Sequence, residues 1–283
     1  MKDIFNKKIL RHKVCLVTGG RTGIGYEIVK FLLDHGADVI VFGRKISLLN
    51  KRFSLRSDFN ERLFVYGCDI TQFELTRNTV QDIVRKFKKI DVLINNASVN
   101  FEIPAEKIMP NILELSIASN LTSHFFLTVL VGRQMIKQRG YKRIINISAY
   151  AGGKAYPGLS HMHVCKAGLD ALTKTLAVEW GRYQILVNGI SPGPILTKNF
   201  IHAHTRLIRL LNRRSVKNVF NEMKENELPL RRFINESDIA NMVLYLCSEA
   251  GSNITGQVIA VDGGVGISNA YFLNQIKEYS NRR

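Results

Sequence analysis

Long hydrophobic runs are missing from this chain of 283 residues. Its apolar segments, such as DVIVF and DVLINN, have the length of strands, whereas a membrane-spanning helix needs about 18 or more mostly apolar residues. The amino-terminal stretch MKDIFNKKILRHK lacks an apolar signal core, and the final NRR is neither a peroxisomal nor an endoplasmic-reticulum address. We therefore expect no transmembrane segment and a cytoplasmic protein.

Cysteines are few, and none belongs to the CxxC pairs typical of zinc or redox sites. All of them lie in largely apolar segments, so we interpret them as buried free thiols. The pairs His161/His163 and His202/His204 are weak candidates for metal ligands, and we expect no metal site. The four cysteines are Cys15, Cys68, Cys165 and Cys247.

Acidic residues are outnumbered by basic ones. Forty Lys and Arg stand against 23 Asp and Glu, a formal net charge of +17 that attracts anions. Nucleic acid, an anionic membrane and a phosphorylated cofactor are all compatible with this charge. Because the sequence has no zinc-finger spacing, RNP motif or heptad repeat, we expect no nucleic-acid partner.

The chain does have a regular alternation of short apolar runs with longer amphipathic stretches, in an ordinary composition of 46% hydrophobic and 22% charged residues. VCLVT precedes GIGYEIVKFLLDHG, and KRIINIS precedes GLDALTKTLAVEWG. This repetition predicts an α/β fold, a doubly wound parallel sheet with helices on both faces. No linker divides the chain, so we predict one domain over 1–283, with a core at 13–265, a helical lid at 198–230 and a tail at 266–283.

The stretch TGGRTGIG follows an apolar run and opens an amphipathic helix, which is the context of a dinucleotide-binding loop. Glycines let the backbone approach a pyrophosphate, and the N–H groups of the first helical turn face the anion. Glycine turns of this kind also occur without a ligand. The residues predicted to contact a cofactor here are Thr18, Gly19, Arg21, Thr22, Gly23, Ile24 and Gly25.

Further segments follow this loop in a fixed order: CDIT at 68–71, NNAS at 95–98, Asn120, SPGPILT at 191–197 and VDGG at 261–264. With them the chain resembles the short-chain dehydrogenase/reductase superfamily. The resemblance implies a single Rossmann domain with a mostly seven-stranded sheet and a nicotinamide cofactor. The further cofactor contacts that it implies are Asp69, Ile70, Asn95, Ala97, Lys166, Pro192, Gly193, Ile195 and Thr197.

The end of the second predicted strand, VIVFGRK, carries Arg44 and Lys45 and no acid. In dinucleotide enzymes an acid at this point binds the ribose diol, while a basic side chain favours a 2′-phosphate. Arg21 lies in the glycine loop, and two guanidinium groups can fork around one phosphate. We therefore predict NADP(H) as the cofactor, with Arg44 among its ligands.

The proton-handling pair usual in this family is absent. Ordinary members place a tyrosine four residues before the lysine and a serine thirteen before the tyrosine, whereas this chain has Met162 and Ala149 there. One interpretation is a catalytically silent NADP-binding subunit or scaffold. Another is that His161 or His163 replaces the tyrosine, since imidazole titrates near neutrality.

A closer resemblance gives a third interpretation. NNASVNFEIPAEKIMPN, VGRQMIKQ and LAVEWG resemble the NADPH-dependent 2,4-dienoyl-CoA reductases, whose tyrosine comes from the loop after the fifth strand. Tyr150, sixteen residues before Lys166, is the candidate. Hydride addition to a dienoyl thioester drives negative charge onto the thioester oxygen, where Tyr150 and Asn120 would donate hydrogen bonds. Lys166 would hold the ribose, and Ser148 is a spare donor.

Three functional hypotheses result. The first is an NADPH-dependent reductase of an unsaturated acyl-CoA or acyl-carrier thioester, with a homotetrameric assembly implied by the family. The second is a reductase of a 3-oxoacyl thioester or other carbonyl with an atypical proton donor, and the third is the silent subunit. In the first, a basic lid would collect the phosphates of CoA. Its arginines are Arg206, Arg209, Arg213 and Arg214.

Overall fold

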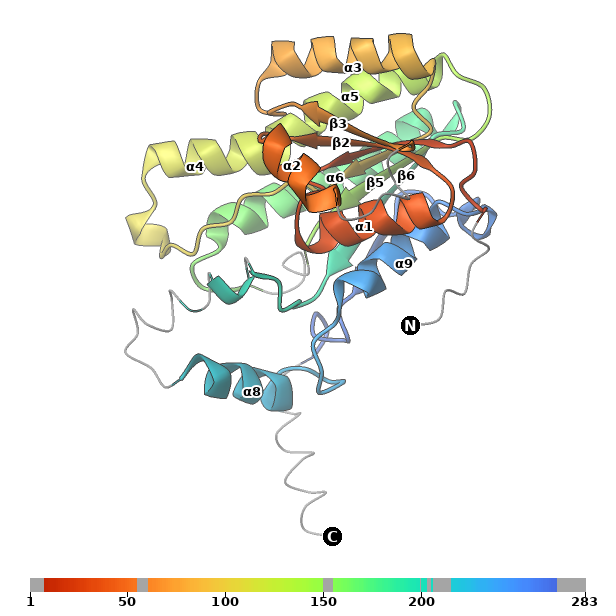
Figure 1. The fold of residues 1–283 in the computed structure, drawn as a ribbon. Coiled ribbons are helices and arrows are strands. Elements are labelled where there is room, and N and C mark those ends of the chain that lie inside the picture. Colours follow the sequence, from red (N-terminus) through yellow and green to blue (C-terminus); the bar gives the residue numbers. More distant parts are fainter. Residues whose placement is uncertain are drawn as a thin grey trace.

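A single seven-stranded parallel sheet organises the computed structural model, which describes residues 8–54, 61–149, 155–198, 200–202, 205 and 215–268. The strand order is β3-β2-β1-β4-β5-β6-β7, so the chain winds outward twice from the middle of the sheet (Figure 1). The predicted doubly wound α/β fold is confirmed. The strands are β1 Val14–Thr18, β2 Asp38–Gly43, β3 Leu63–Gly67, β4 Val92–Asn95, β5 Arg143–Ile147, β6 Leu186–Pro192 and β7 Val258–Val261.

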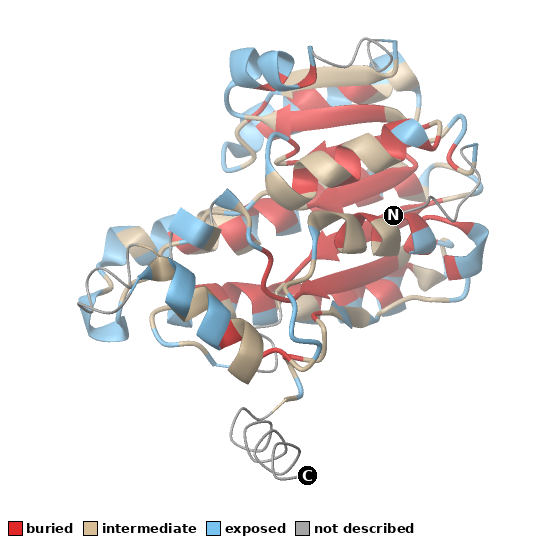
Figure 2. Ribbon diagram, turned by 60° about the horizontal axis from the view of Figure 1, so that its bottom comes forward, coloured by how far each residue is buried: buried red, intermediate tan, exposed pale blue. Residues whose placement is uncertain are grey.

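The central strands are buried on both faces, which explains their unbroken apolar sequence. Every residue of β1, β4 and β5 is buried (Figure 2). Leu16 in β1 pairs in parallel register with Ile40 on one side and Leu93 on the other. Neighbouring β1 residues Cys15 and Val17 point to the opposite face and enter a second hydrophobic core.

Helices cover the two faces of the sheet. Residues of α1, α2 and α9 line one core, and residues of α3, α5 and α6 line the other. The helices are α1 Gly23–Asp34, α2 Ile46–Phe53, α3 Phe73–Phe87, α4 Pro110–Ile117, α5 Ser123–Ile136, α6 Ser160–Gly181, α8 Val216–Asn226 and α9 Glu236–Leu246. Short turns of 3-10 helix occupy η2 Ala105–Lys107 and η5 Glu249–Gly251, and a π-helical turn, η3 Ala118–Thr122, joins α4 to α5.

The helical run from Pro110 to Ile136 is long and apolar enough to cross a membrane by length and composition, with a mean hydropathy of 1.4 in its most apolar window. Sequence analysis missed it because polar residues interrupt every apolar stretch within it. The core helix of a folded protein meets the same criterion. Leu127, Val131 and Met135 in this run are fully buried against the sheet, as expected of such a helix.

The predicted lid at 198–230 contains α8, which lies apart from the sheet beyond the carboxyl ends of the strands (Figure 1). Ser215 caps this helix by accepting a hydrogen bond from the Asn218 backbone N–H at 3.3 Å. Lys217, at the start of α8, is exposed. The lid arginines from 206 to 214 lie outside the described residues.

Candidate active site

The site lies at the carboxyl ends of the strands, next to the point between β1 and β4 where the strand order reverses. In open α/β sheets, ligands bind in the crevice outside such a switch point. The loops after β1, β4, β5 and β6 meet here, and they carry the glycine loop, the NNAS turn, Ser148 and the Pro-Gly loop.

Several positions of the glycine loop require glycine. Gly19 and Gly23 have positive φ angles of 72° and 55°, which L-residues rarely adopt. A Cβ on Gly25 would lie 2.4 Å from the Gly19 carbonyl oxygen. Thr22 is the N-cap of α1, but its side chain makes no capping hydrogen bond. The backbone N–H groups at the start of α1, next to a close-packed glycine loop, are suited to bind a pyrophosphate.

Thr18 and Asn96 fasten this loop to the turn after β4. Thr18 Oγ1 accepts hydrogen bonds from the backbone N–H groups of Asn96 and Ala97 at 2.9 and 3.0 Å. Asn96 Nδ2 in turn donates to the carbonyl oxygens of Thr18 and Gly19 at 3.0 and 3.2 Å. The Thr18 side chain, predicted to bind cofactor, is fully buried and is used to position the loop.

Asn95, another predicted cofactor residue, is also turned into the protein. Its Nδ2 donates to Thr128 Oγ1 and Asn146 Oδ1 at 2.7 and 2.8 Å. Asn146 continues the network by donating to Thr173 Oγ1 at 2.8 Å. These buried bonds tie β4 and β5 to α5 and α6, so the asparagine side chain supports the floor of the site rather than facing its opening.

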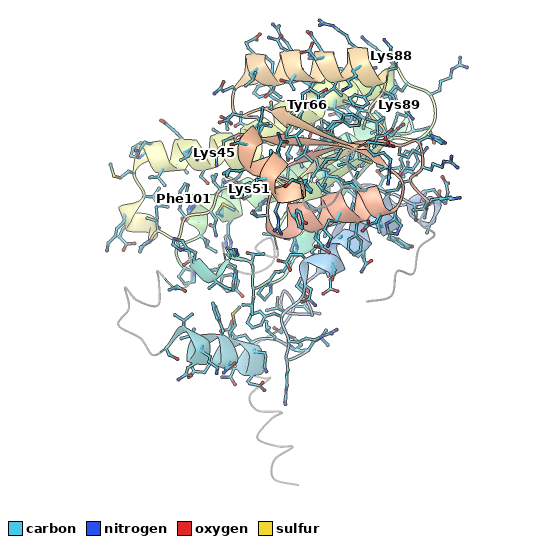
Figure 3. The ribbon with its side chains drawn as sticks, in the orientation of Figure 1. Lys45, Lys51, Tyr66, Lys88, Lys89 and Phe101 are labelled. Carbon is cyan, nitrogen blue, oxygen red and sulfur yellow. The ribbon has the colours of Figure 1, made fainter. Side chains whose placement is uncertain are left out.

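Exposed basic side chains lie in the glycine loop and directly after β2. Arg44 and Lys45 follow β2 directly and are exposed, as is Arg21 in the glycine loop; Figure 3 shows Lys45 near the start of α2. Asp69 uses its Oδ1 to accept from the N–H and hydroxyl of Thr71 at 3.1 and 2.7 Å, which fixes the CDIT turn. Ile70 beside it is half-buried. This arrangement supplies positive charge where a 2′-phosphate would need it.

The Pro-Gly loop reaches back to the glycine loop. A Cβ on Gly193 would lie 2.6 Å from Asp262 Cα, so only glycine fits after Pro192. The Thr197 methyl group would be 3.3 Å from a Cβ on Gly23. Ile195, in the same loop, is buried. The structure therefore brings the two predicted cofactor loops together.

Lys166 is the buried charge of the site. It is only 4% exposed, and its Nζ donates to the Ile147 carbonyl oxygen at 2.8 Å. Burial lowers the pKa of Lys166 to about 8, while Asp170, one helical turn further along α6, raises it. The ammonium group is therefore held at the end of β5, where the predicted nicotinamide ribose would lie.

Ser148 and Asp170 were not recognised as a pair from the sequence. Burial raises the pKa of Asp170, and the Ser148 hydroxyl and Lys166 oppose that rise. Ser148 Oγ and Asp170 Oδ1 are both buried. The spacing of four residues between Lys166 and Asp170 on one helix is the signal that would have found the acid. Ser148 thus faces the Asp170 carboxylate, whose charged form both its hydroxyl and Lys166 stabilise.

Asn120 differs from its expected role as a donor to substrate. It is fully buried, and its Nδ2 lies 3.0 Å from the Val99 carbonyl oxygen, 3.3 Å from Ser116 Oγ and 3.3 Å from Met162 Sδ. Its Oδ1 accepts from Ser98 Oγ at 2.8 Å. The amide is thus occupied by protein groups, and the predicted role would require it to break those bonds.

Met162 fills the place where ordinary family members carry the tyrosine. It is 8% exposed and accepts the hydrogen bond from Asn120. Tyr150, the proposed replacement, lies outside the described residues. The proton donor that sequence analysis assigned to Tyr150 therefore stays a prediction.

His124 was missed by sequence analysis, although it lies four residues after Asn120 on the same helical run. Its Nδ1 is 3.1 Å from the Asn120 carbonyl oxygen. Burial, and secondarily Lys166, lowers its pKa to about 4. The ring is therefore neutral at pH 7 and packs beneath the site without adding charge.

His161 is a poor substitute for the missing acid. Its ring packs 6.3 Å from the Phe101 ring, and the Phe101 backbone is its hydrogen-bond partner. Burial and the neighbouring His163 lower its pKa. Burial lowers the pKa of His163 as well. Both shifts disfavour the charged imidazolium. In the described ranges no group of three His, Cys, Asp or Glu could hold a metal ion.

These features define a Rossmann-type dinucleotide-binding fold with a buried lysine at its switch point. The family described as Enoyl-(Acyl carrier protein) reductase matches residues 19–266. The chain belongs to the short-chain dehydrogenase/reductase family, and the resemblance predicted from sequence is confirmed.

Individual relatives indicate oxidoreductase chemistry. The peroxisomal 2,4-dienoyl-CoA reductase of Danio rerio is 31% identical over 270 residues, covering 94% of this chain and 86% of the relative. The 3-oxoacyl-[acyl-carrier-protein] reductase of Thermotoga maritima is 31% identical over 256 residues, covering 90% of this chain and 98% of the relative. The crystal structure of an actinorhodin polyketide ketoreductase with NADPH superposes with a TM-score of 0.85 at 26% identity, covering 90% of this chain and 98% of that one.

Proposed function

We propose that the protein is an NADPH-dependent reductase of unsaturated acyl thioesters, similar to 2,4-dienoyl-CoA reductase. One observation carries the proposal: Lys166 is held at the end of β5, while Met162 fills the tyrosine position beside it. Reducing a ketone leaves an alkoxide that needs a proton at once, so the loss of a phenol is damaging. A conjugated thioester spreads the charge and needs only hydrogen-bond donors at its oxygen.

NADPH fits the residues of the crevice. The uncapped start of α1 and the close-packed glycines would hold its pyrophosphate, and Arg21 and Arg44 would hold its 2′-phosphate. Lys166 would donate to the nicotinamide ribose. When bound, NADPH supplies the hydride for the reduction.

The chain's own donors would stabilise the thioester oxygen as negative charge arrives there. Ser148 has the required hydroxyl, which would turn from Asp170 toward the substrate, and Tyr150 is the second donor we assign. Lys166 adds positive charge beside Ser148. Removing one such donor typically lowers the rate on the order of 10²-fold. The proton that completes the reduction at carbon would come from water.

The substrate would carry its phosphates on CoA or a carrier protein, and the arginines of the lid would bind them. A relative named 2,4-dienoyl-CoA reductase supports the acyl-thioester class for this chain. We propose a cytoplasmic enzyme that assembles as a homotetramer through the outer face of α5 and α6. Phe125, Phe126, Val164 and Val178 are exposed on these helices, and such large apolar side chains commonly mark protein interfaces. A solution mass of about four times 32.1 kDa would support this assembly, and a monomer mass would contradict it.

The test is NADPH consumption with 2,4-hexadienoyl-CoA, with acetoacetyl-CoA and without substrate. We expect NADPH oxidation with the dienoyl thioester and little with the ketone. Ser148→Ala should lower the dienoyl rate, whereas Ser98→Ala, which removes a hydroxyl already donated to Asn120, is the matched control.

The relative named 3-oxoacyl-[acyl-carrier-protein] reductase favours a second candidate, reduction of a 3-oxoacyl thioester. Faster turnover of acetoacetyl-CoA than of the dienoyl thioester would establish that function and reject the first. Tight NADPH binding without turnover of either substrate would indicate a silent subunit.

A further inference from the structure

The positive charge of the chain is concentrated in four turns. These turns lead into β1, β4, β5 and β6, at 8–13, 88–91, 137–143 and 181–185. They contain ten Lys and Arg and one acid, Asp91, and so hold more than half of the net charge of +17. The ten basic residues are Lys8, Arg11, Lys13, Lys88, Lys89, Lys137, Arg139, Lys142, Arg143 and Arg182.

The four turns form one continuous edge, which we call the basic edge. Their strands are neighbours in the sheet and parallel, so the amino ends lie side by side. Figure 3 shows Lys88 and Lys89 at the end of the sheet opposite Phe101. The basic edge is therefore at the far end of the molecule from the candidate active site.

Hydrogen bonds between the turns make this edge rigid. Lys89 Nζ donates to the His12 carbonyl oxygen at 2.7 Å. The Gln138 side chain bonds both the N–H and the carbonyl of Ile90, each at 3.1 Å. Lys142 Nζ donates to the Gln138 carbonyl at 3.0 Å and so closes the connection to β5. The charges project from a fixed frame.

Some cations of the basic edge are paired or buried, and others are exposed. Lys89 pairs with Asp91 at 2.8 Å, while Lys142 and Arg143 are buried. An outer set is exposed and forms no ion pair with the described residues. Its members are Arg11, Lys88, Lys137, Arg139 and Arg182. Apart from Arg182, whose guanidinium lies 4.8 Å from the centre of the Tyr183 ring, we find no charge-based partner for these cations among the described residues.

The shape and composition of the edge identify the partner. None of its large hydrophobic side chains is exposed, and the Tyr141 ring is covered by Lys13 and Arg143 at 4.1 and 4.3 Å. It therefore lacks the aromatic platforms that stack bases, and it has no protruding helix to enter a groove of a duplex. Four adjacent strands spaced about 4.8 Å apart make a broad, flat row of cations.

We propose that the basic edge binds the surface of an anionic lipid bilayer. The attraction is electrostatic, because Lys and Arg near such a surface gain energy from its negative potential and no apolar residue needs to insert. Binding in this orientation leaves the opposite, carboxyl edge of the sheet open to water. The proposal does not depend on which reaction the active site performs.

Vesicle co-sedimentation tests the proposal with the full-length protein. Vesicles of phosphatidylcholine with about one third phosphatidylglycerol should bind the protein at low salt, and pure phosphatidylcholine should not. Added salt should release it, since the interaction is screened over about 10 Å at 0.1 M ionic strength. A variant with Lys88→Gln, Lys137→Gln, Arg139→Gln and Arg182→Gln should lose on the order of 10²-fold or more in partition.

The matched control removes the same number of charges elsewhere. Lys51→Gln, Lys107→Gln, Lys217→Gln and Arg232→Gln are exposed sites outside the basic edge, and this variant should keep most of the binding. Circular dichroism spectra confirm that both variants fold. Equal binding by the two variants would reject the basic edge as the binding surface, and failure of the wild-type protein to bind anionic vesicles would reject the proposal altogether. Displacement from vesicles by an equal phosphate concentration of duplex RNA would overturn it in favour of a nucleic-acid partner.

Discussion

Replacing Lys166 with methionine should make the nucleotide-free protein more stable at pH 7 while it damages the active site. Burial depresses the pKa of this lysine from 10.5 to about 8. Each pKa unit corresponds to about 1.4 kcal/mol, so keeping the ammonium charged in the fold costs about 3 kcal/mol. The variant also loses the hydrogen bond from Nζ to the Ile147 carbonyl, which lowers its stability by about 1 kcal/mol. The expected net gain is about 2 kcal/mol in the free energy of unfolding.

The stability advantage of Lys166→Met over the wild type should decrease as the pH rises. Below pH 8 the folded and unfolded chains both carry the charge, so the folded state bears the whole penalty. Between about 8 and 10.5 only the unfolded chain keeps the proton, so the wild-type protein gains stability as the pH rises. The advantage of Lys166→Met should therefore shrink across this window and reverse above it, where only the lost hydrogen bond of about 1 kcal/mol separates the two proteins.

Urea unfolding followed by circular dichroism measures this effect. Each variant is compared with the wild type at pH 7 and near pH 10, and Lys174→Met, an exposed lysine on the same helix, is the control. The control should change stability by less than about 0.5 kcal/mol at both pH values. A Lys166→Met variant that is less stable than the wild type at pH 7, or whose gain is the same at both pH values, would refute a buried-charge penalty at this lysine.

Three other substitutions test particular contacts. Gly132→Ala would place a Cβ 2.3 Å from the Trp180 ring; the clash should outweigh the gain of about 1 kcal/mol in helix propensity, so that thermal unfolding shows a lower Tm. Gly25→Ala would press a Cβ against backbone, so titration of protein fluorescence with NADPH should show at least a tenfold weaker affinity, and an unchanged affinity would contradict the assigned loop. Asp170→Asn removes the carboxylate that raises the pKa of Lys166. NMR titration of ¹³C-labelled lysine should therefore find a lower titration midpoint for Lys166 than in the wild type. An unchanged midpoint would mean that Asp170 and Lys166 do not interact.

The sheet and the glycine loop follow from local sequence. VCLVT and DVIVFG coincide with β1 and β2, because buried parallel strands need unbroken apolar runs. Gly25 is required by a single close contact with the backbone of its own loop, which the TGxxxGxG spacing already implies. Both features depend on neighbours along the chain, and a single sequence contains that information.

The polar contacts of the site cannot be predicted from local sequence in the same way. Asn120 was assigned a role at the substrate, but its amide is directed at Val99, Ser116 and Met162, from three separate segments. Thr18 and Asn95 were assigned to the cofactor, and their side chains bond to the protein. Which partner a buried amide or hydroxyl selects depends on rotamers and on segments far apart in sequence. A motif identifies the residue without identifying its hydrogen bonds.

Restoring the family's usual pair tests why the site lacks it. Met162→Tyr combined with Ala149→Ser would place a phenol one helical turn from Lys166, whose ammonium lowers a phenol pKa. If the missing acid is what restricts the site to conjugated thioesters, acetoacetyl-CoA reduction should rise by about 10²- to 10⁴-fold, the usual effect of a positioned proton donor. Met162→Phe with Ala149→Ser has the same ring without the hydroxyl and should show no such rise.

The rate of ketone reduction can be interpreted only if the tyrosine variant still folds and binds NADPH. Met162 is 8% exposed and accepts a hydrogen bond from Asn120, so a larger ring should lower stability by about 1 to 3 kcal/mol in both variants. NADPH affinity shows whether each variant keeps its crevice. A folded, NADPH-binding tyrosine variant that reduces the ketone no faster than the phenylalanine variant would mean that substrate choice is set elsewhere, because the phenol would then be present beside Lys166 and still without effect.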